Sequence, residues 1–224
     1  MTELAYYGHA CFLLKTGKAS ILFDPYLKDN PCQIISPEEV NPDYILVSHG
    51  HSDHLGDAFA IAKRTGATIV STAEIANMAS AAGCNAHAMH LGGKHEFPFG
   101  YVRLTLAFHG SGVPGGHACG FVVNINDTTV YFAGDTALFG DMSLLGKLEK
   151  LDFALLPIGD NFTMGPDDAV VAAELLQARH IVPMHYNTWP VIAQDPQKFK
   201  KAVERKCPST VHIMQPGDSL PLRF

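Results

Sequence analysis

Short apolar segments separated by turn residues dominate the first quarter of the chain. Three of them, at residues 4–7, 11–15 and 19–23, have the length and composition of β-strands. The turn Thr16-Gly17-Lys18 joins the second to the third. A further apolar run at residues 44–47 indicates a buried strand. The segment therefore predicts a β-meander followed by a more deeply buried strand.

Helical periodicity then alternates with strands. Ala58, Ile61 and Ala62 share one face of a helix predicted over residues 57–64. A strand at 68–71 leads into an Ala-rich helix that ends at Gly83, with a capping box at 71–74. The second half of the chain repeats this order of hairpin strands followed by strand–helix units. Its strands are predicted at 101–106, 120–124, 128–132 (after a hairpin turn at 125–127), 153–157, 181–184 and 211–214, and its helices near 144–149, 166–178 and 197–205.

This order predicts an α/β sandwich in which two mixed β-sheets lie face to face with helices outside. Composition agrees, because 47% hydrophobic and 17% charged residues over 224 positions are enough for a sizeable core. We expect residues 1–224 to form a single domain.

Charge and cysteine content limit the classes of partner and the cellular location that we expect. The formal net charge is −6 and no basic run occurs, which argues against a nucleic-acid partner. No apolar run reaches about 18 residues, so no membrane span is expected. The first residues include Glu3 and lack the basic region of a signal peptide, and the five cysteines are isolated. These features predict a cytoplasmic protein that acts on a small molecule, and they are compatible with a homo-oligomer.

The densest chemistry lies in the segment His49-Gly50-His51-Ser52-Asp53-His54, which follows the apolar run at 44–47. In an extended loop His49 and His51 point the same way, whereas Asp53 and His54 lie further along and can serve a second ion. The alternative is a solvated polar loop, which would leave several imidazoles without partners. The pattern therefore favours metal binding.

Three more metal-binding side chains come at the ends of apolar runs: His109, Asp135 and His185. Each alone is an ordinary polar residue at a strand end, but together with the His loop they are what a two-metal cleft needs. A carboxylate such as Asp135 can bridge two cations. Asp24 also ends an apolar run, either as a turn former before Pro25 or as a group that orients the His loop.

The ordered set HGHSDH (49–54), His109, AGDT with Asp135 and PMHYNTW with His185 resembles the metallo-β-lactamase superfamily, over residues 7 to about 195. Within it, GHACF, FDPYL and AFHGSG are similar to a small family of metal-dependent hydrolases, near the ascorbate-phosphate lactonases and the phospholipase D-like enzymes that cleave N-acyl-phosphatidylethanolamine. The resemblance implies the four-layer αββα fold.

The resemblance also implies two divalent metal ions, with zinc or manganese favoured. His49, His51 and His109 would form the first site and Asp53, His54 and His185 the second, with Asp135 bridging. A metal-bridging hydroxide, oriented by Asp53 as a catalytic residue, would attack a phosphodiester, a lactone or another ester.

Two alternatives stay open. One is an iron-dependent oxidoreductase on the same fold, although the diiron flavoprotein branch usually has Glu where this chain has His51. The other is a non-catalytic metal-binding module, which usually lacks some of the ligands that are all present here.

Residues near the motifs are candidates for the substrate pocket: Asn161, Asn187 and Thr188, with Thr163 and Trp189 beside them. The Gly-rich loop after His109 either offers backbone N–H groups to an anion or is simply flexible. His9, in the run GHACF, could orient a metal ligand, and His117 could face the cleft.

Overall fold

The computed structural model describes residues 2–125 and 127–222, and it has two seven-stranded mixed β-sheets. The first sheet has the order β14-β1-β2-β3-β4-β5-β6. Its strands are β1 (Glu3–Gly8), β2 (Cys11–Lys15), β3 (Ser20–Phe23), β4 (Tyr44–Leu46), β5 (Thr68–Thr72), β6 (Asn85–Met89) and β14 (Ser219–Pro221). Neighbours from β14 to β3 pair antiparallel, and neighbours from β3 to β6 pair parallel.

The second sheet has the order β13-β12-β11-β10-β9-β8-β7. Its strands are β7 (Lys94–Phe97), β8 (Gly100–Leu106), β9 (Cys119–Ile125), β10 (Thr128–Phe132), β11 (Phe153–Pro157), β12 (His180–Met184) and β13 (Thr210–Val211). Here too an antiparallel part, from β7 to β10, continues into a parallel part, from β10 to β13. The two halves of the chain therefore share one topology.

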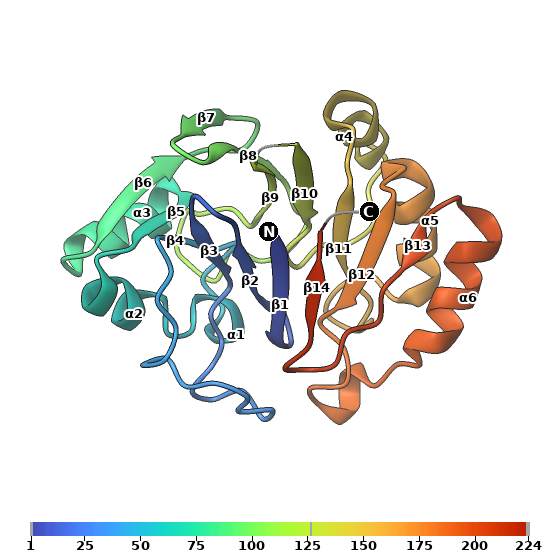
Figure 1. Ribbon diagram of the computed structural model, residues 1–224, viewed down its shortest axis with the longest axis horizontal. Helices are drawn as coiled ribbons and strands as arrows, with labels where there is room; N and C mark the ends of the chain where they lie inside the picture. Colours follow the sequence, from blue (N-terminus) through green and yellow to red (C-terminus); the bar gives the residue numbers. More distant parts are fainter. Residues whose placement is uncertain (1, 126, 223–224) are drawn as a thin grey trace.

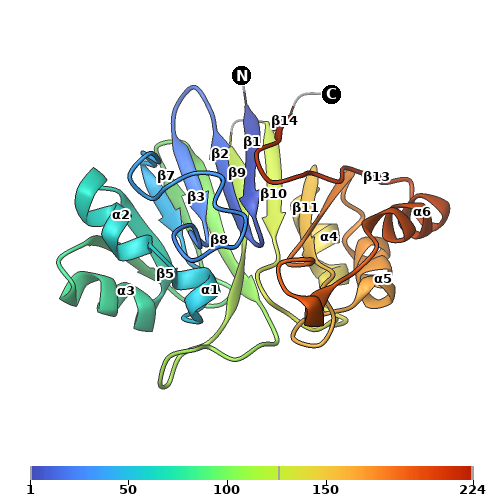
Figure 2. The ribbon, with the colours of Figure 1, turned by 90° about the horizontal axis from the view of Figure 1, so that it is seen from below.

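Helices cover the outer face of each sheet (Figures 1 and 2). The helices of the described residues are α1 (Ser52–Leu55), α2 (Ala58–Thr65), α3 (Ala73–Ala81), α4 (Met142–Glu149), α5 (Pro166–Leu176) and α6 (Pro196–Lys206), with a 3₁₀ turn η1 (Pro190–Ile192). In Figure 2, α2 and α3 flank the first sheet and α4, α5 and α6 flank the second. The predicted four-layer αββα sandwich is confirmed.

Alternation of side chains along the strands builds the layers. Along β3, Ile21 and Phe23 enter the core between the two sheets, whereas Leu22 packs into the core beneath α2 and α3. Phe23 stacks on Phe132 of β10 across the sandwich, with ring centroids 4.9 Å apart. This contact fixes the carboxyl ends of β3 and β10 side by side, and the chain places carboxylates just beyond both ends.

Several sequence-based expectations differ from the structure. The capping box at 71–74 is wrong, because Ser71 lies in β5 and its hydroxyl donates to the Val47 carbonyl, while Thr72 makes no side-chain cap. The strand expected at 211–214 ends at Val211, since the chain leaves the second sheet there to add β14 to the first. Neither α1 nor β14 was predicted. Of the hairpin turn at 125–127, Asn126 lies outside the described residues.

None of the helices in residues 2–125 and 127–222 combines the length and the hydrophobicity needed to cross a bilayer. The parallel strands β3, β4 and β5 end at the same edge of their sheet, as do β10, β11 and β12 in the other. Loops at such carboxyl ends are where α/β proteins usually bind ligands.

Candidate metal centre

Three histidines converge on one side of the centre. His49 Nε2 lies 2.9 Å from His51 Nδ1, and His109 Nε2 lies 3.2 Å from the same atom. His49 and His51 follow β4 of the first sheet, and His109 follows β8 of the second. Burial and the nearby His54 lower the pKa of His49 to about 2, so its imidazole is neutral and can offer a lone pair to a cation. We call these three residues the first group.

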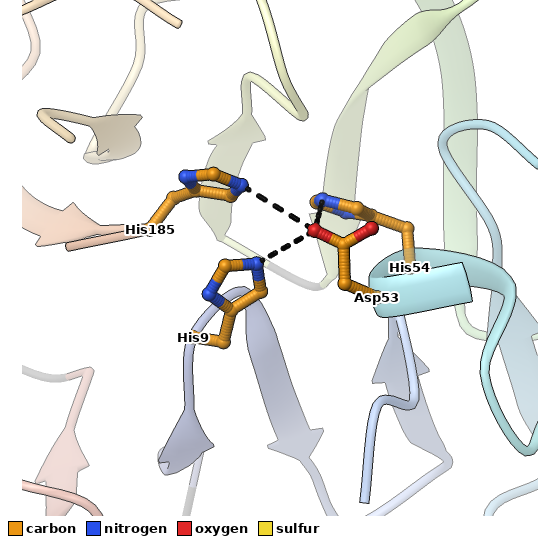
Figure 3. Close-up of side chains that lie close together, drawn as sticks. All are labelled: His9, Asp53, His54 and His185. Atoms are coloured by element: carbon orange, nitrogen blue, oxygen red, sulfur yellow. Dashed lines mark hydrogen bonds and ion pairs between the residues drawn. The ribbon is translucent and has the colours of Figure 1, made fainter. Parts of the chain in front are cut away.

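Four side chains lie together on the other side: His9, Asp53, His54 and His185 (Figure 3). We call Asp53, His54 and His185, the three that the sequence motifs assign to a metal, the second group. Asp53 Oδ2 lies 3.6 Å from His54 Nε2 and 3.8 Å from His185 Nε2. Asp53 and His54 belong to the short helix α1, whereas His185 directly follows β12. His9 approaches the same carboxylate from the turn after β1, with its Nε2 3.1 Å from Asp53 Oδ2. Both sheets therefore contribute side chains to each group.

Asp135 lies between the two groups. Its Oδ2 is 3.6 Å from His109 Nε2 of the first group and 3.1 Å from His185 Nε2 of the second. Within the described residues, Asp135 Oδ1 is a buried atom without a hydrogen-bond partner, and the buried His54 Nε2 and His185 Nε2 have only ion-pair contacts with carboxylates of the centre. Leaving such an atom unpaired costs about 1–3 kcal/mol. Imidazole nitrogens and carboxylate oxygens in one place fit the coordination of divalent cations.

The buried carboxylate of Asp24 orients this arrangement from behind. It accepts hydrogen bonds from the Ser48 N–H at 2.7 Å, the Ser48 hydroxyl at 2.6 Å and His54 Nδ1 at 2.6 Å. Because Nδ1 of His54 donates to Asp24, its Nε2 faces Asp135 and, once deprotonated, is the atom that would offer a lone pair to a cation. Asp24 thus fixes both the ring orientation and the tautomer of His54, the role that the sequence offered as one of two alternatives.

The charges of the second group favour a cation. Burial alone would raise the pKa of Asp53 and Asp135, but neighbouring imidazoles, His185 among them, outweigh it and hold both pKa values below their usual range. Burial alone would lower the pKa of His54 and His185, but the Asp135 carboxylate outweighs it and raises the pKa of both. The two ionised carboxylates therefore face two imidazoles that favour the protonated form, and a bound cation would take the place of the imidazole protons.

The Gly-rich loop after His109 packs against the His loop. The Gly50 N–H donates to the Ser111 carbonyl at 2.7 Å. Gly112 has a φ of +68°, and a Cβ built on it would lie only 2.5 Å from the backbone nitrogen of His51. The absence of a side chain at Gly112 thus lets the two loops approach closely. This contact supports His51, a role that neither reading of the sequence contained.

The predicted substrate residues separate into two kinds. The Thr188 hydroxyl lies 2.8 Å from His9 Nδ1 and so adjoins the second group. Asn187 is exposed, and its Oδ1 accepts from the Gln194 N–H. Asn161 is also exposed, with its N–H bonded to Asp160. Within the described part of the chain, no hydrogen bond joins either asparagine to the two groups.

His9 is the contributor that sequence reasoning left ambiguous. Its ring lies 4.0 Å from that of His185, 4.8 Å from Trp189 and 5.7 Å from Tyr26, measured between centroids. His9 and Thr188 also line a cavity of about 240 Å³ whose lining does not include Asp53. The run GHACF was the only signal for His9, since a single histidine after a short strand is common. His117 instead packs against His90 and remains exposed.

A comparison with known protein families identifies the superfamily of this chain. A family model described as a beta-lactamase superfamily domain matches residues 3–185, from β1 to the last residue of the second group. The chain belongs to this superfamily. The resemblance predicted from the ordered motifs is therefore confirmed.

Relatives of similar length carry a common name. A UPF0173 metal-dependent hydrolase of Natranaerobius thermophilus is 50% identical over 218 residues, covering 97% of this chain and 98% of that protein. One of Heliobacterium modesticaldum is 52% identical, covering 99% and 98%. The solved structure of Igni18, a metallo hydrolase from Ignicoccus hospitalis, superposes with a TM-score of 0.92 at 35% identity and covers 98% of this chain and 97% of that one. The chain is a metal-dependent hydrolase of this superfamily.

Proposed function

We propose that the chain is a dinuclear hydrolase that cleaves a small-molecule phosphodiester, lactone or other ester. The observation that supports this proposal is the position of Asp135, whose Oδ2 lies 3.6 Å from His109 Nε2 and 3.1 Å from His185 Nε2. A carboxylate within reach of both groups is suited to bridge two cations. A mononuclear centre would have no need of both groups.

In this proposal the first group (His49, His51 and His109) would hold one cation and the second (Asp53, His54 and His185) the other. Imidazole-rich ligation suits zinc, and the carboxylates of the second group also tolerate manganese. Cations held there would polarise the scissile oxygen and lower the pKa of water from about 15.7 toward neutrality.

The remaining steps belong to side chains of the chain itself. Asp53 is the most accessible member of the second group, with its side chain 22% exposed against 0% for His54 and 1% for His185. Its carboxylate can therefore accept a hydrogen bond from the attacking water and orient that water toward the substrate. Asp24 and Ser48 hold the loop below it, so that the carboxylates and imidazoles are in place before the substrate binds.

Residues of both sheets are needed for each group, and we infer that residues 1–224 work as one domain. All five cysteines are free thiols, which suits a reducing, cytoplasmic setting.

The decisive test combines metal content with hydrolysis. The protein is purified without added metal, its zinc, manganese and iron are measured by elemental mass spectrometry, and it is assayed on a phosphodiester, a lactone and a carboxylic ester. We expect about two zinc or manganese ions per chain and turnover of one substrate class.

His51→Ala should remove activity together with metal, whereas the exposed His90→Ala should leave both unchanged. Full activity of His51→Ala at unchanged metal content would contradict the assignment. Two iron ions with redox turnover but no hydrolysis would replace it with the oxidoreductase alternative.

A further inference from the structure

The sequence motifs assign His9 to neither metal, yet it lies in the cluster of the second group and, within the described residues, makes the shortest ion-pair contact with Asp53. His9 Nε2 lies 3.1 Å from Asp53 Oδ2, against 3.6 Å for His54 Nε2 and 3.8 Å for His185 Nε2 (Figure 3). His9 is 1% exposed and occupies the turn between β1 and β2. The accessible carboxylate on the short helix α1 is thus held from a different part of the chain.

The direction of this hydrogen bond follows from the chemistry of the pair. An ionised carboxylate can only accept, so His9 Nε2 carries the proton and donates it to Asp53. The other ring nitrogen, Nδ1, pairs with the Thr188 hydroxyl at 2.8 Å. Rotating the imidazole would break both bonds in a buried place, so the ring is fixed.

The main chain of His9 holds the second group as well. Its carbonyl accepts the backbone N–H of His185 at 2.8 Å and the Tyr6 hydroxyl at 3.1 Å. His9 therefore contacts Asp53 through its side chain and His185 through its backbone. Asp53 follows β4 of the first sheet and His185 follows β12 of the second, so these two contacts span the interface between the sheets.

We propose that His9 is a positioning residue. It fixes the position of the Asp53 carboxylate relative to His185, so that the second group can retain its cation. This inference rests on the proposed two-metal function. It assigns His9 an effect on the second group alone, because the first group has no contact with His9 in the described residues. Thr188 acts through His9 by fixing its ring.

The test measures zinc binding rather than activity alone. Zinc alone is titrated into five metal-free proteins, and calorimetry resolves the two binding steps. The proteins are the wild type, His9→Ala, His9→Gln, Thr188→Val and the control His90→Ala. In His9→Ala we expect one of the two steps, that of the second group, to lose about ten- to a hundredfold in affinity and the step of the first group to stay unchanged. Thr188→Val should fall between His9→Ala and the wild type, and His90→Ala should match the wild type.

His9→Gln separates a positioning role from direct ligation. The amide nitrogen of Gln can reach the place of Nε2 and donate to Asp53, whereas its amide oxygen is a much weaker ligand for zinc than an imidazole nitrogen. We expect it to restore most of the lost affinity. Thermal unfolding of the metal-free variants checks the fold, and Thr188→Val keeps the test decisive if His9→Ala does not fold.

The outcomes separate the two proposals. The inference alone is overturned if the wild type binds two zinc ions and both binding affinities are unchanged in His9→Ala. It is also overturned if the wild type binds two zinc ions and the zinc affinity of the second group falls equally in His9→Ala and His9→Gln. His9 would then be a ligand. A wild type that binds a single zinc ion contradicts the dinuclear function itself, and the inference fails with it.

Discussion

The two halves of the chain build the same sheet but supply the metal centre differently. In each sheet three antiparallel pairings are followed by three parallel ones, from β14 to β6 in the first and from β7 to β13 in the second, although β14 itself comes from the end of the chain. The first half supplies four proposed ligands from one loop after β4, at residues 49–54. The second supplies three single residues after three different strands: His109, Asp135 and His185. Equal topology therefore does not dictate equal roles.

Equivalent positions make the contrast sharper. Asp24 follows β3 as Asp135 follows its counterpart β10, and His9 follows β1 as His109 follows β8. The second-half members reach the centre and are proposed ligands. The first-half members contact proposed ligands instead, with Asp24 bonded to His54 and His9 bonded to Asp53. The long β4 loop occupies the centre in the first half, so residues after β1 and β3 lie behind it.

Asp135 offers the strongest test of this contrast between proposed ligands in the second half and orienting residues in the first. Asp135→Asn keeps the shape of the side chain but removes the charge that contacts both groups. We expect hydrolysis to fall by about a thousandfold or more, and the metal content to fall below that of the wild type. Steady-state kinetics and elemental mass spectrometry check this. An active Asp135→Asn with its full metal complement would remove the proposed bridge.

The equivalent change in the first half should cost less. Asp24→Asn keeps one acceptor oxygen, which can still serve the Ser48 N–H, but replaces by an N–H₂ donor the oxygen that accepts from the Ser48 hydroxyl and from His54 Nδ1. We expect a loss of about 10- to 100-fold in metal affinity, without complete loss of activity at saturating zinc. Rescue of activity by added zinc distinguishes it from Asp135→Asn. If both variants lose activity equally and zinc rescues neither, the division into ligands and orienting residues is wrong.

The sequence was sufficient for elements whose stability is local. The bounds of β2 and β11 were predicted at both ends, because apolar runs and their flanking turns lie within a few residues. The strand β14 has three residues and depends on pairing with β1 at the opposite end of the chain. The helix α1 has four residues, too few for periodicity to reveal.

The same division applies to the metal centre. The proposed ligands were recognisable because four lie within six residues and the others directly follow apolar runs. The structure brings all seven together, and their roles remain proposals. The contact of His9 with Asp53 joins residues 44 positions apart. Nor could composition reveal that Gly112 contacts the backbone of His51, since that depends on a φ of +68° and on close packing of two loops.

The Gly-rich loop offers a smaller test of how the second half supports the first. In Gly112→Ala the new Cβ would meet the His51 backbone, whereas in Gly115→Ala, at a similar φ of +71°, it would meet nothing within 4 Å. Both changes carry the strain of a positive φ, but only Gly112→Ala should displace His51. We expect it to weaken the zinc-binding step of the first group by about tenfold.

Zinc calorimetry on both variants checks this, with Gly115→Ala as the matched control. Equal losses in the two variants would show that backbone strain, rather than the contact with His51, is responsible.

The smallest effect is expected where the halves match most closely, at the cysteines that begin β2 and β9. Cys11 is fully buried among apolar residues beneath α2 and α3. Cys119 is equally buried, but its Sγ lies 3.3 Å from the Ser48 carbonyl, which can accept a hydroxyl proton. Cys11→Ser should therefore lower the free energy of unfolding by about 1–3 kcal/mol, and Cys119→Ser should lower it less.

Denaturant unfolding measures both changes. The zinc stoichiometry should stay that of the wild type in each variant, because neither thiol belongs to a metal-binding group. A greater loss of stability in Cys119→Ser would mean that the Ser48 carbonyl does not compensate for the buried hydroxyl. A well-folded Cys11→Ser without hydrolysis would mean that the interior of the first half also takes part in the chemistry, beyond holding the β4 loop in place.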